Sequence, residues 1–160
     1  MYKSSAAITL LIFIVACNTT TTDNSEVKKD SFDTSSTPMT IQVPNTRCFS
    51  SVKGKDTVYL KLEKFPNVVT GDLSYKLYEK DSNNGTIDGK MNGDTLIAEY
   101  TFMSEGQQSI RQVAFLIKDS IATEGYTDAE DKDGKMVFKN TAALDFSKGL
   151  QLKEIACPLE

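Results

Sequence analysis

The sequence predicts an all-β fold over residues 45–160, a small antiparallel up-and-down barrel of about eight strands. Three observations support this fold class. Apolar and polar residues alternate in short runs from Arg47 onward, as they do in half-buried strands. Turn-forming residues separate the runs, and no stretch keeps a helical period. Two cysteines, Cys48 and Cys157, bracket the whole set of runs.

The expected strands follow one another closely along the chain. Alternation is clearest in three runs, whose apolar faces are Val58, Leu60 and Leu62; Val69, Leu73, Tyr75 and Leu77; and Leu96, Ala98, Tyr100 and Phe102. Further strands are expected over 85–92, 109–118, 120–127, 135–139 and 150–156. Turns are expected at Asn83-Asn84-Gly85, Asn92-Gly93-Asp94 and Asp133-Gly134.

Successive hairpins must protect the edges of their sheet. An up-and-down barrel does so most simply, and a β-sandwich is the alternative. Three glycines inside the runs, Gly71, Gly89 and Gly125, fit the bends or bulges of a tightly curved sheet. The aromatic side chains either fill the core of such a barrel or line a ligand cavity, as in lipocalin-like carriers.

Cys48 and Cys157 are expected to form a disulfide. An even pair of cysteines is typical of domains in an oxidising compartment, and the first and last strands of a closed barrel are neighbours. Two free thiols are the alternative. Because the chain has no Cys-x-x-Cys pair to lower a thiol pKa, the expected role of this bond is structural.

Residues 1–16 have the form of a bacterial lipoprotein signal peptide. One cation, Lys3, precedes an uncharged run over 6–16 that is too short to span a bilayer as a helix. The run ends in Ile-Val-Ala-Cys, which resembles the lipobox of bacterial lipoproteins. The resemblance implies that 1–16 are removed and that Cys17 carries the lipid. An uncleaved membrane anchor and plain secretion are the alternatives.

The segment 17–44 is expected to be a lipidated, disordered tether. Thr, Ser, Asp and Asn dominate it, and its few apolar residues follow no period. Flexible-chain scaling gives it a span of roughly 28 Å. Asn18 follows Cys17, whereas an Asp there resembles the inner-membrane retention signal of some Gram-negative bacteria. We therefore expect the outer membrane, with the domain facing the periplasm or the cell surface.

The composition argues against nucleic-acid binding and against most catalytic and metal-binding functions. The formal net charge is −4 and no basic face is visible, so nucleic acid is not an expected partner. The chain has no histidine, which removes the usual catalytic triads and the common zinc sites. The stretches 81–85 and 131–134 lack the full spacing of a calcium loop. We expect no catalytic residue, metal or cofactor; a hydrolase that uses two carboxylates is the least favoured alternative.

Three triplets share the order Asp, hydroxyl residue, branched aliphatic residue. They place Thr57, Thr95 and Ser120 after turns, at the start of expected strands. A purely structural interpretation is available, since Asp in a turn bonds its own backbone and Thr begins strands well. The triplet also resembles the acceptor sequence of periplasmic O-glycosylation in Bacteroidota. On that resemblance the three hydroxyl groups are candidate sugar acceptors.

The strand-rich layout between Cys48 and Cys157, with the lipobox and the Thr70-Gly71 strand pattern, resembles small lipoproteins of Bacteroidota. These are loosely similar to the N-terminal barrel of the NlpE-type envelope-stress lipoproteins. The Cys-x-x-Cys motif of that barrel is missing here, so its copper chemistry is not implied. The resemblance implies an anchored, non-enzymatic protein that binds or scaffolds an envelope partner. The alternative is a carrier of a small hydrophobic ligand.

Overall fold

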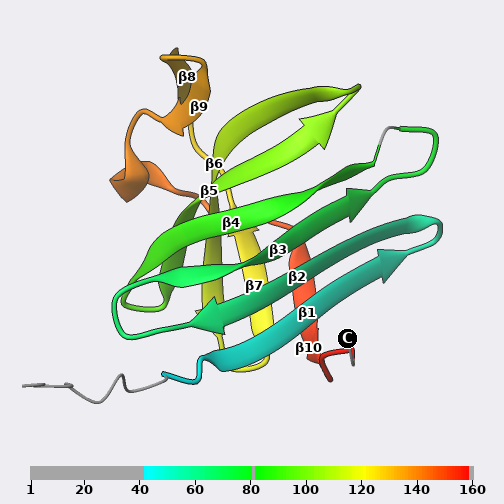
Figure 1. The fold of residues 1–160 in the computed structure, drawn as a ribbon, viewed down its shortest axis with the longest axis vertical. Coiled ribbons are helices and arrows are strands. Elements are labelled where there is room, and N and C mark those ends of the chain that lie inside the picture. Colours follow the sequence, from blue (N-terminus) through cyan, green and yellow to red (C-terminus); the bar gives the residue numbers. More distant parts are fainter. Residues whose placement is uncertain (1–41, 81, 159–160) are drawn as a thin grey trace, which may run out of the picture. The chain divides into compact units, whose positions relative to one another are not determined.

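The computed structural model describes residues 42–80 and 82–158. The predicted leader, Cys17 and the tether up to residue 41 lie outside the described residues, and 42–44 have no regular structure. The described elements are β1 (Asn45–Lys53), β2 (Asp56–Lys64), β3 (Val69–Lys76), β4 (Asn83–Asn92), β5 (Thr95–Ser104), β6 (Gln107–Lys118), β7 (Ile121–Gly125), β8 (Ala129–Lys132), β9 (Lys135–Phe138), the 3-10 turn η1 (Thr141–Ala143) and β10 (Gln151–Ile155) (Figure 1).

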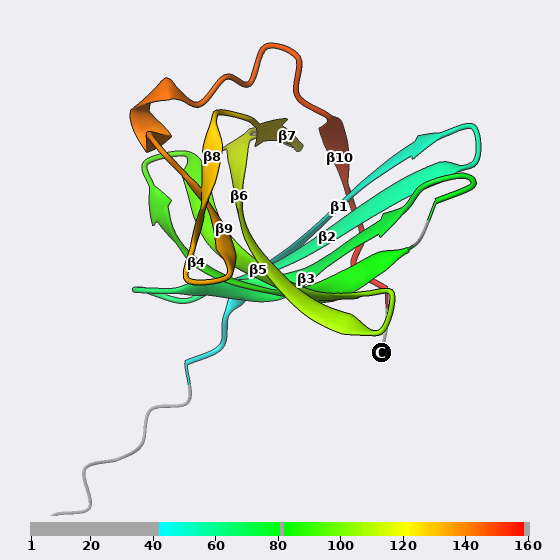
Figure 2. The ribbon, with the colours of Figure 1, turned by 90° about the horizontal axis from the view of Figure 1, so that it is seen from above.

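Eight of these strands close into an antiparallel barrel, which confirms the predicted fold class. Each strand from β1 to β6 pairs with the next one along the chain. β10 then pairs with both β7 and β1 and completes the ring (Figure 2). The chain leaves the ring between β7 and β10. There β8 and β9 form a hairpin, and β9 pairs in parallel with β6 at Ile110 and Arg111.

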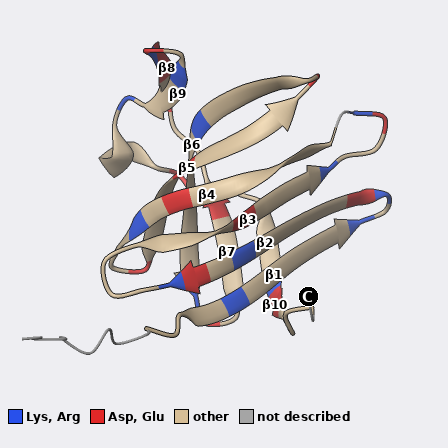
Figure 3. Cartoon of the chain, in the orientation of Figure 1, with Lys and Arg blue, Asp and Glu red and all other residues tan. Residues whose placement is uncertain are grey.

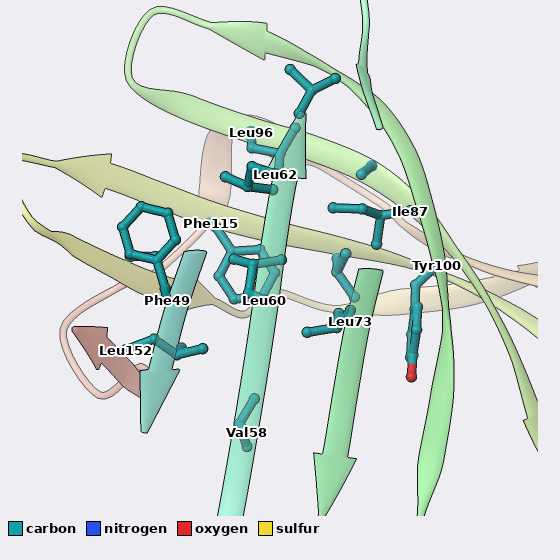
Figure 4. Packing of buried hydrophobic residues seen from close by; sticks show 14 of the residues in the cluster. Phe49, Val58, Leu60, Leu62, Leu73, Ile87, Leu96, Tyr100, Phe115 and Leu152 are labelled. Carbon is teal, nitrogen blue, oxygen red and sulfur yellow. The ribbon is translucent and has the colours of Figure 1, made fainter. Parts of the chain in front are cut away.

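Side chains on the inward face of the strands form one hydrophobic core. Side chains along a strand point alternately to the two faces of the sheet. Because apolar residues occupy every second position in each run, they all face the barrel interior. Figure 4 shows these side chains pointing toward one another. Each large one, such as Leu60, stabilises the fold by roughly 1.5–3 kcal/mol. The core residues are Phe49, Val58, Leu60, Leu62, Val69, Leu73, Tyr75, Ile87, Leu96, Ala98, Tyr100, Val113, Phe115, Ala122 and Leu152.

Two inward-facing glycines let neighbouring backbones approach closely. A Cβ on Gly71 would lie 1.9 Å from the Lys61 carbonyl oxygen, and one on Gly89 would lie 2.3 Å from that of Ile97. Only glycine fits such a close approach, and the strand pairing continues through both positions without a bulge. Gly125 has a different role, because a Cβ there would lie 2.3 Å from the ring of Phe146.

One predicted turn is wrong. Asn83-Asn84-Gly85 begins β4, where Asn83 pairs with Tyr75 and Gly85 pairs with Leu73. The chain turns earlier, at 78–80, where Glu79 has a φ of 55°. Asn and Gly favour turns, but here pairing with β3 and β5 outweighs the local preference. The predicted turns at 92–94 and 133–134 are confirmed at their Gly-Asp and Asp-Gly pairs.

A disulfide spans the seam that closes the ring. Cys48 and Cys157 have Cα atoms 5.2 Å apart and sulfur atoms 2.13 Å apart. Cys48 pairs in register with Ile155 of β10, two residues before Cys157. Because the next residue, Phe49, points into the core, Cys48 lies on the outer face. There the Tyr59 hydroxyl donates to its Sγ at 3.2 Å. The bond thus joins the first and last strands of the barrel.

Candidate functional site

One end of the barrel is hollowed into a small cleft, which we call the mouth. It lies where β1 begins and β2 ends, and it receives side chains from five strands and from the β4–β5 turn. Its volume is about 150 Å³, below the range of about 300–1,000 Å³ that is usual for small-molecule pockets. The lining residues are Asn45, Arg47, Leu62, Lys64, Val69, Met91, Gly93, Asp94 and Ile117.

The mouth is the last inward-facing layer of the barrel. Strand register sets this layer, since Lys64 pairs with both Asn45 of β1 and Val69 of β3. Buried Leu62 and Val69 belong to the core and form the apolar floor. Toward the barrel end, the next inward-facing residues are polar or cationic, as Lys64 is after Leu62. The mouth therefore combines an apolar floor with a polar rim.

Arg47 is fixed on this rim by its hydrogen bonds. Its Nε and Nη2 donate to the two carboxylate oxygens of Glu154 at 2.9 and 2.8 Å, and Nη2 also donates to the Asp119 carbonyl oxygen. The guanidinium lies 4.9 Å from the Phe49 ring centroid. Hydrogen bonding to Glu154 raises the Arg47 pKa, and the same bonds lower the Glu154 pKa. Both groups stay charged at neutral pH, which holds the rim in one geometry.

Two shallower grooves adjoin the mouth and share Lys64 with it. One, of about 400 Å³, follows the β2–β3 connection 64–69 and reaches Lys90 and Met91. The other, of about 590 Å³, lies between Val43 and the pair Phe65-Pro66. The linings of the three clefts include Asp94 and three cations, Arg47, Lys64 and Lys90. Arg47 is already paired with Glu154, so Lys64 and Lys90 are the cations that favour an anionic group here. This end suits a group that is anionic and partly apolar.

The opposite end of the barrel is closed by a polar and aromatic cluster, which we call the plug. Its carboxylate, Glu124, is 6% exposed. The hydroxyls of Tyr75 and Tyr126 each donate to one of its oxygens at 2.7 Å. Glu124 faces inward because Ala122, two residues earlier on β7, does so. A buried carboxylate needs such donors, so the three side chains form one unit.

Arg111 completes the plug. Its guanidinium carbon lies 5.2 Å from the ring centroid of Tyr75 and 5.6 Å from those of Tyr100 and Phe102. Those last two rings stack with centroids 4.6 Å apart. Among the described residues, the buried Tyr100 hydroxyl and Arg111 Nε find no hydrogen-bond partner. The plug is therefore packed mainly by ring and cation contacts.

The plug tyrosines remain protonated at neutral pH. Burial raises the pKa of Tyr100 to about 12, although the nearby Arg111 charge acts in the opposite direction. Burial, and after it Glu124, raise the pKa of Tyr75 and of Tyr126 well above the usual value. These hydroxyls act as hydrogen-bond donors to Glu124, an arrangement suited to holding structure rather than to moving protons.

The structure does not bring the three candidate glycosylation sites together. Thr57 is the second residue of β2, at the plug end, and is half-buried. Thr95 begins β5 at the mouth end and is also half-buried, while Ser120 is exposed in the turn between β6 and β7. Their glycosylation stays a prediction. Cys17, the predicted lipidation site, lies outside the described residues.

Arg47, Lys64 and Glu124 were not predicted as site residues from the sequence. The signal for Glu124 was present, because a charged residue occupied an inward position in an otherwise apolar alternation. The rim residues gave a weaker signal, since cations at strand ends are common and usually solvated. Tyr75 and Tyr100, which were expected either to fill the core or to line a cavity, belong to the core.

Comparison of the chain with protein-family models, with curated proteins and with solved structures finds no match. Over 42–80 and 82–158, no three acidic or cysteine side chains gather as ligands for a metal ion. Within the same ranges, no helix has the length and apolar character needed to cross a membrane.

Proposed function

We propose that this chain is a lipoprotein of the bacterial envelope, anchored in the outer membrane through Cys17, with a non-enzymatic binding or scaffolding role. One observation carries the binding role: the barrel interior is filled by the hydrophobic core, and the mouth combines an apolar floor with a polar rim at one end of it. β1 also begins at that end, directly after residues 42–44. The lipobox-like sequence that ends at Cys17 supports the anchor. We propose that an envelope partner docks at the mouth.

A carrier of a small hydrophobic ligand is the second candidate. The apolar floor of Leu62, Val69 and Ile117 favours it. The packed interior limits it, because a cleft of about 150 Å³ admits only part of an ordinary ligand. A hydrolase is not proposed, since the buried carboxylate of Glu124 is already held by two tyrosine donors. Charges of both signs are interspersed over the outer strands (Figure 3), so no nucleic-acid partner is proposed.

The anchor is tested by Cys17→Ser. Two or three acyl chains hold a protein on a membrane almost permanently, whereas a serine receives none. We expect the parent protein to sediment with the outer membrane and the variant to move to the soluble fraction. Metabolic labelling with radioactive palmitate should mark the parent alone. A variant that sediments with membranes as firmly as the parent would contradict lipid anchoring at Cys17.

Docking at the mouth is tested by reversing one charge on its rim. Lys64→Glu should lower the recovery of a cross-linked envelope partner about tenfold, because a like charge then meets an anionic group. The matched control is Lys132→Glu on the exposed strand β8, away from the mouth. Quantitative mass spectrometry after cross-linking in intact cells compares the three proteins. Equal recovery with all three would place the partner elsewhere.

A further inference from the structure

The barrel seam between β1 and β10 is paired along only part of its length. β1 pairs with β2 over all of Asn45–Lys53 but with β10 only over Cys48–Ser50. β10 meanwhile stays on β7, and the Glu124 N–H donates to the Leu150 carbonyl at 2.9 Å. The two strands therefore diverge beyond Ser50, as Figure 2 shows for the β1–β2 hairpin and β10.

The divergence leaves a groove, which we call the notch. Its volume is about 440 Å³. It lies on a different part of the barrel from the mouth, toward the plug end of β1. Its lining residues are Ser50, Ser51, Val52, Lys53, Gly149, Gln151 and Lys153.

The direction of the β1 hydrogen bonds follows from its hairpin. β1 and β2 are joined by the two-residue turn Gly54-Lys55, so Lys53 and Asp56 form the closing bonded pair. Bonded pairs alternate along an antiparallel ladder, so Val52 directs its N–H and C=O away from β2. Ser50, two residues earlier, points the same way and pairs with Lys153. Val52 is next in this series; it pairs with Thr57 of β2, but among the described residues it has no partner on the β10 side.

The same alternation applies to β10. Leu150 and Glu154 bond to the β7 side, through the Glu124 N–H and the Ser120 carbonyl. Residues at the alternate positions of β10 bond to the opposite side, so Gln151 directs its backbone N–H and C=O toward the notch. Two strand edges thus face the groove with free backbone groups. Edges of this kind accept an added strand from another polypeptide.

The charge of the notch lining indicates which kind of polypeptide segment could bind there. The notch lining contains two exposed lysines, Lys53 and Lys153, and no acidic residue. Val52 is 68% exposed and offers an apolar cross-strand contact beside them. We propose that the notch binds an extended acidic polypeptide segment, which adds as a short strand along Val52. A second copy of the chain fits poorly, because its own edge would bring lysines against lysines.

The test uses the mature, disulfide-bonded protein and a fluorescent peptide of alternating Glu and Val, with a Lys-Val peptide as the probe's control. Val52→Pro removes the one N–H that the added strand needs and spares the β2 ladder, which does not use it. We expect its affinity for the acidic peptide to fall at least about tenfold. Val52→Thr keeps the N–H and should bind within about twofold of the parent.

Amide hydrogen exchange on the unmodified protein gives a readout that does not depend on the proline variant folding. The acidic peptide should slow exchange at Val52 and Gln151, and 0.5 M salt should weaken the effect. The proposal is overturned if the Lys-Val peptide binds equally, or if Val52→Pro binds like the parent. It is also overturned if protection appears without peptide, through dimerisation or through residues 18–41, since the occupant is then the chain itself.

Discussion

Replacing Cys48 and Cys157 together by alanine is expected to lower the free energy of unfolding by roughly 2–5 kcal/mol. The disulfide closes a loop with a sequence separation of 109, so its loss releases a large part of the unfolded chain's conformational freedom. It also acts at the seam where β1 and β10 share only three paired positions. A domain of this size buries a modest core, which makes the loss severe.

Urea unfolding followed by circular dichroism measures this effect. The control is the parent protein reduced with a thiol, because it loses the bond but keeps both sulfur atoms. Cys48 is fully buried, and the difference between the reduced parent and the double alanine variant reports the packing lost at that position. A loss below about 1 kcal/mol in the reduced parent would contradict a stabilising role for the bond.

Replacing Tyr75 and Tyr126 together by phenylalanine is expected to cost roughly 2–5 kcal/mol of stability. Each hydroxyl donates to one oxygen of Glu124, and the double variant leaves a buried carboxylate without these donors. The control adds Glu124→Leu to the double variant. Removing the charge together with its donors should recover most of the lost stability, because no buried carboxylate is then left without its two donors. An equal loss in both variants would assign the effect to ring packing instead.

The stability of the protein at alkaline pH provides a second test of the two tyrosines that donate to Glu124. The folded state raises the pKa of Tyr75 and Tyr126 above their unfolded value near 10, so the unfolded chain releases protons first. The contribution of these two hydroxyls to the free energy of unfolding is complete below pH about 10 and is lost as the pH rises beyond that value. The stability difference between the parent and the double phenylalanine variant should therefore narrow between about pH 10 and 12. Phenolate absorbance measured during unfolding follows the titration.

Much of the fold was predictable because half-buried strands show an alternation of apolar and polar residues in the local sequence. The inward faces of β2, β3 and β5 follow directly from residues such as Leu60, Leu73 and Leu96, since alternation has the period of the strand itself. The all-β class and the closed barrel of eight strands follow from repeating that pattern between turns. β8 left no such trace, because Ala129–Lys132 is exposed throughout and carries three charged residues in a row.

The candidate sites depended on tertiary structure instead. Asn83 belongs to a strand only because β3 offers a partner, and Glu124 is a buried acceptor only because Tyr75, 49 residues away, reaches it. Likewise, no local pattern in the sequence shows that β10 diverges from β1 at Val52. The sequence by itself determined which residues face inward, because that depends on neighbours two positions apart. Where ladders stop and which side chains meet depends on contacts across the barrel, which no local pattern encodes.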